Sequence, residues 1–393
     1  MEEIVILEGA RTPMAEYNGA FSDISAIDLA VHASREALKR SGTEPEEIEH
    51  VIFGNALQTS GDAIYGARHV ALKSGIPKEV PALTVNRLCG SGFESIVQAS
   101  HRITLGEART VLAGGMENMS QAPHVIRGAR KGLKLGQGQL EDSLMVALLD
   151  TYAGLYMAET SDRVAAKYGI TREEQDAYAL SSQQRASAAW ASCRLSEEVV
   201  PVEWKSGRKT MRVEKDDHLR PETTLEALAA LPPSFGEGGQ VTAGNASGIV
   251  DAAAAVVVTS AERARAKGRK PLGRLIASAV VGCEPELMGL GPAPAARAAL
   301  QKAGLAMKDI DLWEINEAFA GQILGVIREL GLDRERLNVN GGAIALGHPL
   351  AATGTRCTLT LLKELQRRGL RYGLAGACIG GGQGIAVVVE GLG

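Results

Sequence analysis

The chain has 393 residues, of which 45% are hydrophobic and 22% are charged, with a formal net charge of −4. This length allows two or three domains with a large core, and the composition excludes a disordered or collagen-like chain. The negative charge, with no basic run beyond 263–270, argues against nucleic acid as a partner, whereas 46 glycines and only 4% aromatic residues predict an aliphatic core with close backbone approaches.

The sequence carries no signal for a membrane, for export or for a metal. The best candidate run, 252–258, is far shorter than the ~18 apolar residues that a membrane helix needs. The chain opens with Met-Glu-Glu before an apolar strand, which is unlike a signal peptide. Its five cysteines include no CxxC pair, and its seven histidines lack ligand spacing. We therefore expect a cytoplasmic protein with reduced thiols, no metal and no membrane partner.

Two similar units follow each other along the chain. An offset of 262 residues aligns Arg35 with Arg297 and Gly114 with Gly376. The expected helices span 26–40, 92–104, 293–302 and 353–367, and the expected strands span 50–53, 110–113, 312–315 and 372–377. Alternating helices and buried strands predict two α/β halves in which helices cover mainly parallel sheets.

Residues 120–245 interrupt this rhythm and read as an insertion that lies over the surface of the first half. The insertion contains a long expected helix around 172–192, and the run 248–260 returns the chain to the core as a buried strand. The expected domains are the first half at 1–119 plus 246–270, the inserted loop domain at 120–245 and the second half at 271–393.

The first candidate site is the segment 85–92, which reads VNRLCGSG and leads into the helix expected from 92. A cysteine at such a turn lies near unpaired backbone N–H groups and the positive end of the helix dipole, which favour the thiolate. Cys89 is therefore a candidate nucleophile. The alternative is a small residue that fills a tight turn.

The second unit contains further polar candidates. Asn316 stands at a strand end, where its amide could orient a water or donate to an oxyanion, and Glu317 could orient a neighbour. His348 lies on the glycine-rich loop NGGAIALGHP, and the 262 offset places it three positions from the equivalent of Cys89. If the halves face each other about a pseudo-twofold axis, these residues form the Cys–His pair needed for activated thiol catalysis.

The last candidate is the segment 377–384, which reads ACIGGGQG. Cys378 follows a buried strand, and the glycine run offers backbone N–H groups to a developing oxyanion. A phosphate-binding loop is excluded because no GK[ST] follows and because the run leads into a strand.

Together these segments resemble the thiolase family. VNRLCGSG, NEAFA, GGAIALGHP and CIGGGQG occur in that family's order, and RPETT at 220–224 and VTAGNASG at 241–248 extend the similarity through the insertion. The resemblance implies two thiolase-like halves in a five-layer αβαβα core. It also implies an inserted loop domain that binds coenzyme A and serves oligomerisation, and a homotetramer built as a dimer of dimers.

The resemblance also implies roles for the candidate residues. Cys89 would be the nucleophile that becomes acylated, and His348 would activate it and form a first oxyanion hole with a water held by Asn316. Cys378 would exchange a proton with the α-carbon of the second acyl-CoA. The backbone N–H groups of Cys89 and Gly380 would form a second oxyanion hole.

For coenzyme A, the resemblance points to Arg220 near the nucleotide end and Ser247 on the pantetheine arm. The acyl and pantetheine tunnel would be lined by Leu148, Met157, Phe235, Ala246 and Phe319, with ordinary core packing as the alternative for each. Coenzyme A thioesters are then substrates, and no cofactor is expected.

Two positions depart from the family pattern. Tyr156 stands where many acetoacetyl-CoA-forming members have histidine, and Phe93-Glu94 replaces a small aliphatic and basic pair. Both positions bear on the acyl-chain length that the enzyme prefers and on the direction of the reaction.

The sequence thus predicts an acyl-CoA C-acyltransferase. The leading hypothesis is acetyl-CoA C-acetyltransferase, which interconverts two acetyl-CoA with acetoacetyl-CoA and CoA. The alternatives are a broad 3-ketoacyl-CoA thiolase of β-oxidation and a non-catalytic acyl-CoA or lipid-binding relative. A decarboxylating ketosynthase is disfavoured because those enzymes generally have histidine in place of Cys378.

Overall fold

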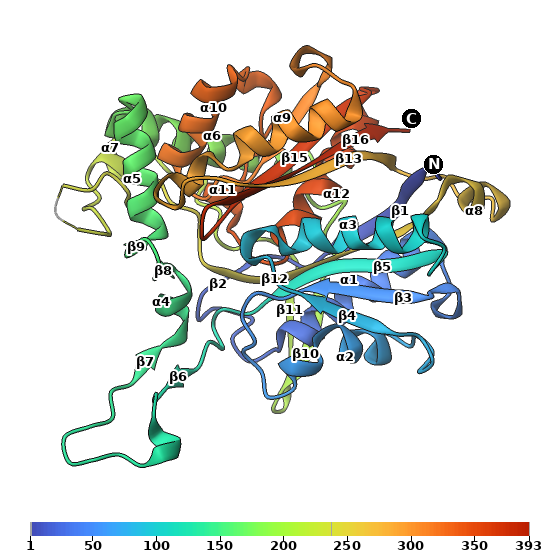
Figure 1. Cartoon of the computed structure of the whole chain (residues 1–393), viewed down its shortest axis with the longest axis horizontal. Coiled ribbons are helices and arrows are strands. Elements are labelled where there is room, and N and C mark those ends of the chain that lie inside the picture. The colour runs from blue at the N-terminus through green and yellow to red at the C-terminus, as the bar shows by residue number, and fades with distance from the viewer. Residues whose placement is uncertain (1, 237, 393) are drawn as a thin grey trace.

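The computed structural model describes residues 2–236 and 238–392, and its centre is a ten-stranded mixed sheet (Figure 1). The strand order is β14-β15-β16-β13-β1-β12-β5-β3-β4, with β2 paired to β12. The strands are β1 Ile4–Arg11, β2 Ala15–Glu16, β3 His50–Gly54, β4 Ala82–Val85, β5 Thr110–Glu117, β12 Val250–Ser260, β13 Gly273–Gly282, β14 Leu312–Ile315, β15 Tyr372–Ile379 and β16 Gln383–Gly391.

Some helices cover the two outer faces of this sheet, and others lie in a middle layer between the strands of its two halves. Those of the two halves are α1 Ala26–Ser41, α2 Gly66–Lys73, α3 Ser91–Thr104, α8 Ala261–Ala266, α9 Pro292–Ala303, α10 Ala320–Leu330, α11 Ala343–Leu346 and α12 Thr353–Arg368. Both α1 and α9 end at a glycine in the left-handed conformation, as the expected stop signals require.

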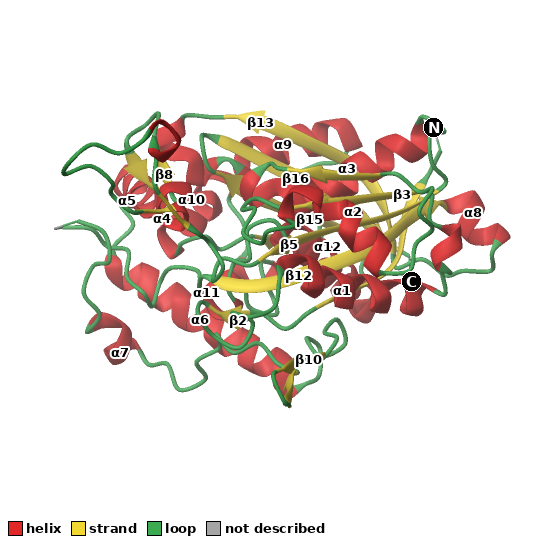
Figure 2. Cartoon of the chain, turned by 90° about the horizontal axis from the view of Figure 1, so that it is seen from below, coloured by secondary structure: helices red, strands yellow, loops and turns green. Residues whose placement is uncertain are grey.

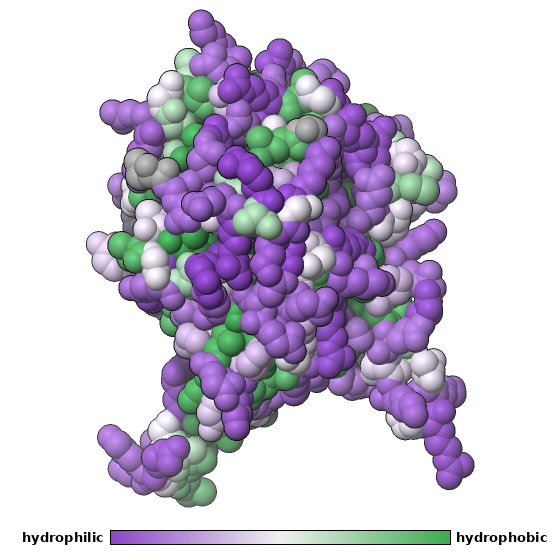
Figure 3. Space-filling view, turned by 90° about the vertical axis from the view of Figure 1, so that its right-hand side faces the viewer, coloured by the Kyte–Doolittle hydropathy of each residue, from purple (hydrophilic) through white to green (hydrophobic). Residues whose placement is uncertain are grey.

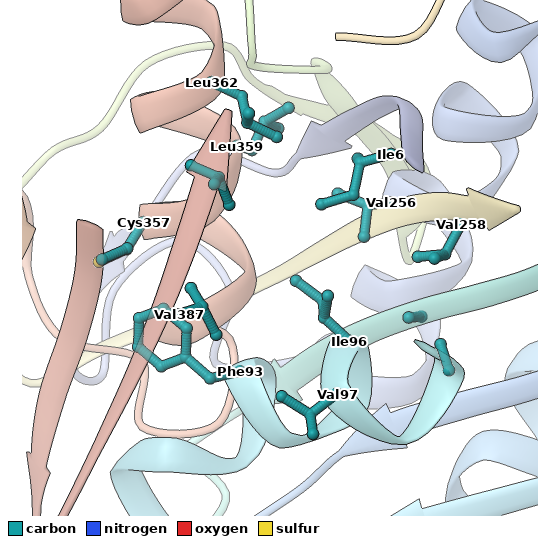
Figure 4. Packing of buried hydrophobic residues seen from close by; sticks show 14 of the residues in the cluster. Ile6, Phe93, Ile96, Val97, Val256, Val258, Cys357, Leu359, Leu362 and Val387 are labelled. Atoms are coloured by element: carbon teal, nitrogen blue, oxygen red, sulfur yellow. The ribbon is translucent and has the colours of Figure 1, made fainter. Parts of the chain in front are cut away.

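Side-chain alternation along the strands separates the core into layers. Ile385, Val387 and Val389 of β16 face the middle layer, whereas Ala386 and Val388 face the layer of α9 and α10. The strands of the N-terminal half likewise divide their side chains between the middle layer and α1. In the middle layer, α3 and α12 pack between strands of both halves (Figure 4). The predicted five-layer αβαβα fold is confirmed.

The expectation of mainly parallel sheets is wrong. Among the strands of the described residues, the parallel pairs are β3–β4, β3–β5 and β14–β15, whereas β12, β13 and β16 pair antiparallel with their neighbours. The helix–strand repeat indicated the parallel pairs, but the long return strand β12 and the β15–β16 hairpin reverse the chain. The two halves share one sheet because β1 also pairs with β13 over Ile4–Ile6.

The insertion covers both halves and not the first alone. Its elements are β6 His124–Val125, β7 Glu141–Asp142, α4 Ser143–Ala147, β8 Leu149–Asp150, β9 Leu155–Tyr156, α5 Met157–Tyr168, α6 Arg172–Ala191, β10 Val202–Ser206, β11 Lys209–Val213 and α7 Leu225–Ala229. Helices α5 and α6 pack on α10 of the second half, at the end of the molecule opposite α8 (Figure 2). The insertion is held to the first half by Arg11 of β1, which pairs with the insertion residues Glu198 at 2.6 Å and Asp216 at 2.6 Å.

Two glycines allow α3 and α12 to cross in close contact. Gly92 and Gly354 are equivalent under the 262 offset, and each lies against the other helix. A Cβ on Gly354 would lie 2.2 Å from the Phe93 nitrogen, and a Cβ on Gly92 would lie 2.6 Å from the Ala351 oxygen. Thr355 Oγ1 also donates a hydrogen bond of 3.1 Å to the Gly92 carbonyl. The starts of the two helices are therefore in backbone contact.

Replacing Gly354 with alanine tests this contact. Alanine normally stabilises a helix by about 1 kcal/mol relative to glycine. At this position we expect the opposite, a loss of about 1–3 kcal/mol in the free energy of unfolding, because the methyl group overlaps backbone that cannot move aside. Urea unfolding measures the change. Gly61→Ala is the control, since its Cβ would meet open space. An unchanged stability of Gly354→Ala would contradict the close crossing.

Candidate active site

Cys89 lies in a single 3-10 turn, Leu88–Gly90, between β4 and α3. Leu88 adopts a positive φ of 47°, an unusual conformation for a bulky residue, and Asn86 Oδ1 accepts its N–H at 2.9 Å. The Ser91 hydroxyl closes the turn by donating to the Leu88 carbonyl at 2.7 Å and accepting the Arg87 N–H at 2.8 Å. The turn thus presents the thiol at the start of α3.

His348 is held from both sides in a neutral form. Its backbone N–H donates to the Gly248 carbonyl at 2.9 Å, and Nδ1 lies 2.6 Å from Thr353 Oγ1. Because the Thr353 hydroxyl donates to the Pro349 carbonyl, we assign the Nδ1 proton to the bond with Thr353. Burial, together with the positive charge of Arg356, lowers the pKa of His348 to about 3. The Nε2 lone pair is therefore available to accept a proton.

Asn316 follows β14 and lies beside the imidazole. Its Nδ2 is 3.4 Å from His348 Nε2. Its buried Oδ1 has no hydrogen-bond partner among residues 2–236 and 238–392, and it can accept a bond from a substrate group or a water. Glu317 fixes the same loop by accepting bonds from Tyr178 at 2.9 Å and Ser182 at 2.7 Å.

Cys378 lies at the end of β15 and is 1% exposed. The next turn places Gly381 and Gly382 at a φ of 82°, which only glycine adopts easily. The Gly380 N–H donates to Cys89, but burial outweighs this bond and raises the pKa of the Cys89 thiol to about 11. Burial and the nearby Cys89 and Cys283 also raise the pKa of Cys378. Both thiols are therefore protonated at neutral pH.

One cavity of about 480 Å³ brings Cys89, His348 and Cys378 together from the two halves. Of the residues expected to bind coenzyme A, those that line this cavity are Leu148, Met157, Phe235, Ala246, Ser247 and Phe319. Asn316 and Gly380 stand behind the lining, in contact with His348 and Cys89 respectively. Arg220 lies outside the lining, where its guanidinium pairs with Glu16.

Several residues of the site escaped the sequence analysis. Thr353, which orients His348, is the first residue of α12, a hydroxyl position that a helix-start search could have found. Met288 lines the cavity from a short helical turn at Pro285–Leu290 and carries no local signal. Glu16 and His218 also line it, with the carboxylate 3.0 Å from Nδ1, although 202 residues separate them.

The arrangement suits acyl transfer through a thioester. It contains a thiol nucleophile, a neutral imidazole that can take its proton, a second thiol that can act as acid or base, and backbone N–H groups at the thiol. Within residues 2–236 and 238–392, no cluster of His, Cys, Asp or Glu could hold a metal. No helix in the same ranges could cross a membrane, and the face in Figure 3 is mostly hydrophilic.

Comparison with known proteins finds similarity along nearly the whole chain. The family models for the thiolase N-terminal and C-terminal domains match residues 4–262 and 269–391. Human mitochondrial 3-ketoacyl-CoA thiolase is 52% identical over 98% of both chains, and the acetyl-CoA acetyltransferase of Cupriavidus necator is 44% identical over 99% of this chain and 100% of that one.

Solved structures agree with the sequence comparison. The human mitochondrial thiolase in complex with CoA aligns with a TM-score of 0.96 at 50% identity, covering 100% of this chain and 98% of that chain. The Bacillus anthracis acetyl-CoA acetyltransferase aligns with a TM-score of 0.97 at 43% identity, covering 100% and 99%.

The raised pKa of Cys89 predicts how its alkylation depends on pH. Only the thiolate reacts with iodoacetamide, so the rate at Cys89 should rise about tenfold per pH unit from about pH 7 to about pH 10. An ordinary cysteine would level off near pH 9. Peptide mapping by mass spectrometry measures the rate, and Cys89→Ala supplies the background of the other cysteines. A plateau below pH 8 would show that the free enzyme holds a thiolate.

Proposed function

The chain belongs to the thiolase family and is an acyltransferase, and from this premise we propose that it is a 3-ketoacyl-CoA thiolase that accepts chains longer than acetoacetyl-CoA. The observation that carries the proposal is the apolar wall of the cavity beside Cys89. Leu148, Met157 and Met288 line it, and the Tyr156 ring packs against Phe235 with centroids 5.5 Å apart. A chain of several methylene groups is stabilised there by about 0.8 kcal/mol per buried CH₂.

In thiolysis, Cys89 attacks the 3-keto carbon. The thiol proton passes to Nε2 of His348, the sulfur–carbon bond forms, and the carbonyl oxygen becomes an oxyanion. The bond between carbons 2 and 3 then breaks, and Cys378 gives its proton to the carbanion, so acetyl-CoA leaves. The thiol of free CoA then gives its proton to the Cys378 thiolate and attacks the acyl group on Cys89. The bond between the acyl carbon and Cys89 breaks, His348 returns its proton to the Cys89 sulfur, and an acyl-CoA shortened by two carbons leaves.

Two groups of donors stabilise the negative charge that develops in these steps. His348, with a water held by Asn316, would serve one oxyanion, and the N–H groups of Cys89 and Gly380 would serve the other. The 3.4 Å contact between Asn316 Nδ2 and His348 Nε2 supports the first pair. The Gly380 N–H directed at Cys89 supports the second. Loss of one such donor raises the barrier by about 2.7–4 kcal/mol.

A second candidate is acetyl-CoA C-acetyltransferase, the condensation of two acetyl-CoA into acetoacetyl-CoA. The relative from Cupriavidus necator carries that name and covers the full chain at 44% identity. The same residues serve this direction, because Cys378 would then remove the α-proton and acyl-Cys89 would be the acceptor. Tyr156, in the position where the family resemblance places histidine in such enzymes, favours the first candidate.

Coenzyme A would enter along the insertion. Ser247 and Ala246 line the cavity near the pantetheine arm, and the human relative's structure contains CoA. Arg220 would meet the nucleotide end; it pairs with Glu16, which also contacts His218 in the cavity lining. Nothing beyond the coenzyme A substrates is needed for the reaction, so we propose no further cofactor. The cytoplasmic location expected from the sequence stays a prediction.

The assembly we propose is a homotetramer, formed as a dimer of dimers. The segment around 126–140 projects from the body of the protomer (Figure 1) and exposes Ile126, Leu133, Leu135 and Leu140. In the part of the chain that the structure describes, edge strand β4 pairs with β3 alone, and the exposed Ile64, Tyr65 and Leu72 precede it by about 10–20 residues in the sequence. Exposed apolar groups and an open strand edge are typical of surfaces covered by another subunit.

A chain-length series tests the substrate proposal. We expect kcat/KM for thiolysis of eight-carbon 3-ketoacyl-CoA to equal or exceed that for acetoacetyl-CoA, because the longer chain gains apolar contacts. Tyr156→His should reduce the preference for the longer chain about tenfold. Tyr152→His is the control, because Tyr152 is 90% exposed and does not line the cavity. Activity confined to acetoacetyl-CoA would favour the second candidate.

Replacing Leu135 with serine tests the assembly. Leu135 is fully exposed in the protomer, so serine there should not lower protomer stability by more than about 0.5 kcal/mol. Light scattering coupled to size exclusion should report a tetramer for the parent protein and a dimer for the variant. Leu105→Ser is the control, since Leu105 is also exposed but follows α3 at another surface. A monomeric parent protein would contradict the proposal.

A further inference from the structure

Glu117 is a buried carboxylate at the end of β5 that the mechanism above does not use. Its side chain is fully buried. Oε1 accepts bonds from Asn55 Nδ2 at 3.0 Å and from the Leu57 N–H at 2.9 Å, and Oε2 accepts the N–H groups of Ala56 at 3.1 Å and Ala351 at 3.0 Å. Four donors from two distant segments therefore meet at one carboxylate.

The first of these segments leads to the nucleophile. Asn86, three residues before Cys89, donates from Nδ2 to the Ala56 carbonyl at 3.1 Å. Ala56 and Leu57 also pack in one apolar cluster with Cys89 and Leu350. The loop at 55–57 thus connects Glu117 to the Cys89 turn.

The second segment leads to the base. Ala351 lies between His348 and Thr353, the residue that orients the imidazole. The backbone is closely packed here, because a Cβ on Gly115 of β5 would lie 1.9 Å from the Ala351 oxygen. The bond from Ala351 to Glu117 crosses from the second half of the chain to the first.

We propose that Glu117 is a positioning residue that fixes the Cys89 turn and the His348 loop relative to each other. The inference rests on the proposed thiolase chemistry at Cys89. A buried carboxylate costs free energy unless its bonds are complete. Among residues 2–236 and 238–392, Glu117 has four hydrogen-bond donors and no cationic partner. Its hydrogen bonds therefore join two catalytic loops instead of forming an ion pair.

Two substitutions separate the reach of the side chain from its charge. In Glu117→Gln, one oxygen becomes an NH₂ group that faces two N–H donors, so one pair of bonds is lost. In Glu117→Asp, the charge remains, but the shorter side chain cannot reach both segments. Asp251→Asn is the matched control, because Asp251 is also buried and accepts the Met119 and Ser120 N–H groups, at 2.7 and 3.1 Å.

The test combines steady-state thiolysis of acetoacetyl-CoA, iodoacetamide labelling of Cys89 and thermal unfolding. Both Glu117 variants should lose about a hundredfold in kcat, with KM changed by less than about threefold, because misplacement of the catalytic groups spares substrate binding. The rate of Cys89 alkylation should change in both variants, and it should be faster in Glu117→Gln than in Glu117→Asp, because, in addition to burial, the Glu117 charge raises the pKa of Cys89. Each variant loses buried hydrogen bonds, so Asp251→Asn should lower Tm about as much as the Glu117 variants do. Its kcat and its rate of Cys89 alkylation should stay within about threefold of the parent values.

The proposal is overturned if either folded Glu117 variant keeps the parent kcat, or if Asp251→Asn loses as much kcat as they do. If Glu117→Gln does not fold, Glu117→Asp carries the same comparison. A parent protein without thiolysis would instead contradict the proposed function, and the labelling rates would still decide whether Glu117 positions Cys89.

Discussion

The crossing of α3 and α12 at Gly92 and Gly354 is the constraint on which the active site depends. Cys89 precedes the first helix, and the His348 loop leads into the second. Because each helix begins in backbone contact with the other, residues separated by 259 positions along the chain share one cavity. The same contact accounts for part of the glycine excess, since a Cβ at either position would force the catalytic loops apart. Duplication thus supplied two similar helices whose starting ends carry different chemistry.

The chemistry of the cavity follows from the burial of its reacting groups. Burial raises the pKa of both thiols and lowers that of His348, so the resting site holds neutral groups at neutral pH. Negative charge appears only as the reaction proceeds, and backbone and amide N–H groups are already in place to receive it. Preorganised donors of this kind favour the transition state over the bound substrate. Glu117 and Arg356 are buried behind the lining, where, in addition to burial, Arg356 lowers the pKa of His348 and Glu117 raises that of Cys89.

The sequence was informative where local patterns decide the structure. Helix starts, glycine stops and the cysteine and histidine motifs predicted the positions of α1, α3, α9 and α12 closely. The directions of β12 and β13 could not be predicted, because these strands pair with β1, β5 and β16 across long stretches of the chain, whereas the tight β15–β16 hairpin requires antiparallel pairing. The surface covered by α5 and α6, the contact between Glu16 and His218, and the bond from Ala351 to Glu117 depend on distant pairs that leave no local signal. The roles of the individual catalytic residues came from the family resemblance.

The central claim is that the two halves divide the work, with Cys89 carrying the acyl group and Cys378 moving the α-proton. The most direct measurement is peptide mapping by mass spectrometry after the Cys378→Ala variant is mixed with acetyl-CoA and quenched. The account predicts one acetyl group on the peptide that contains Cys89, together with no detectable acetoacetyl-CoA. An acetyl group on another residue, or condensation at the parent rate in this variant, would contradict it.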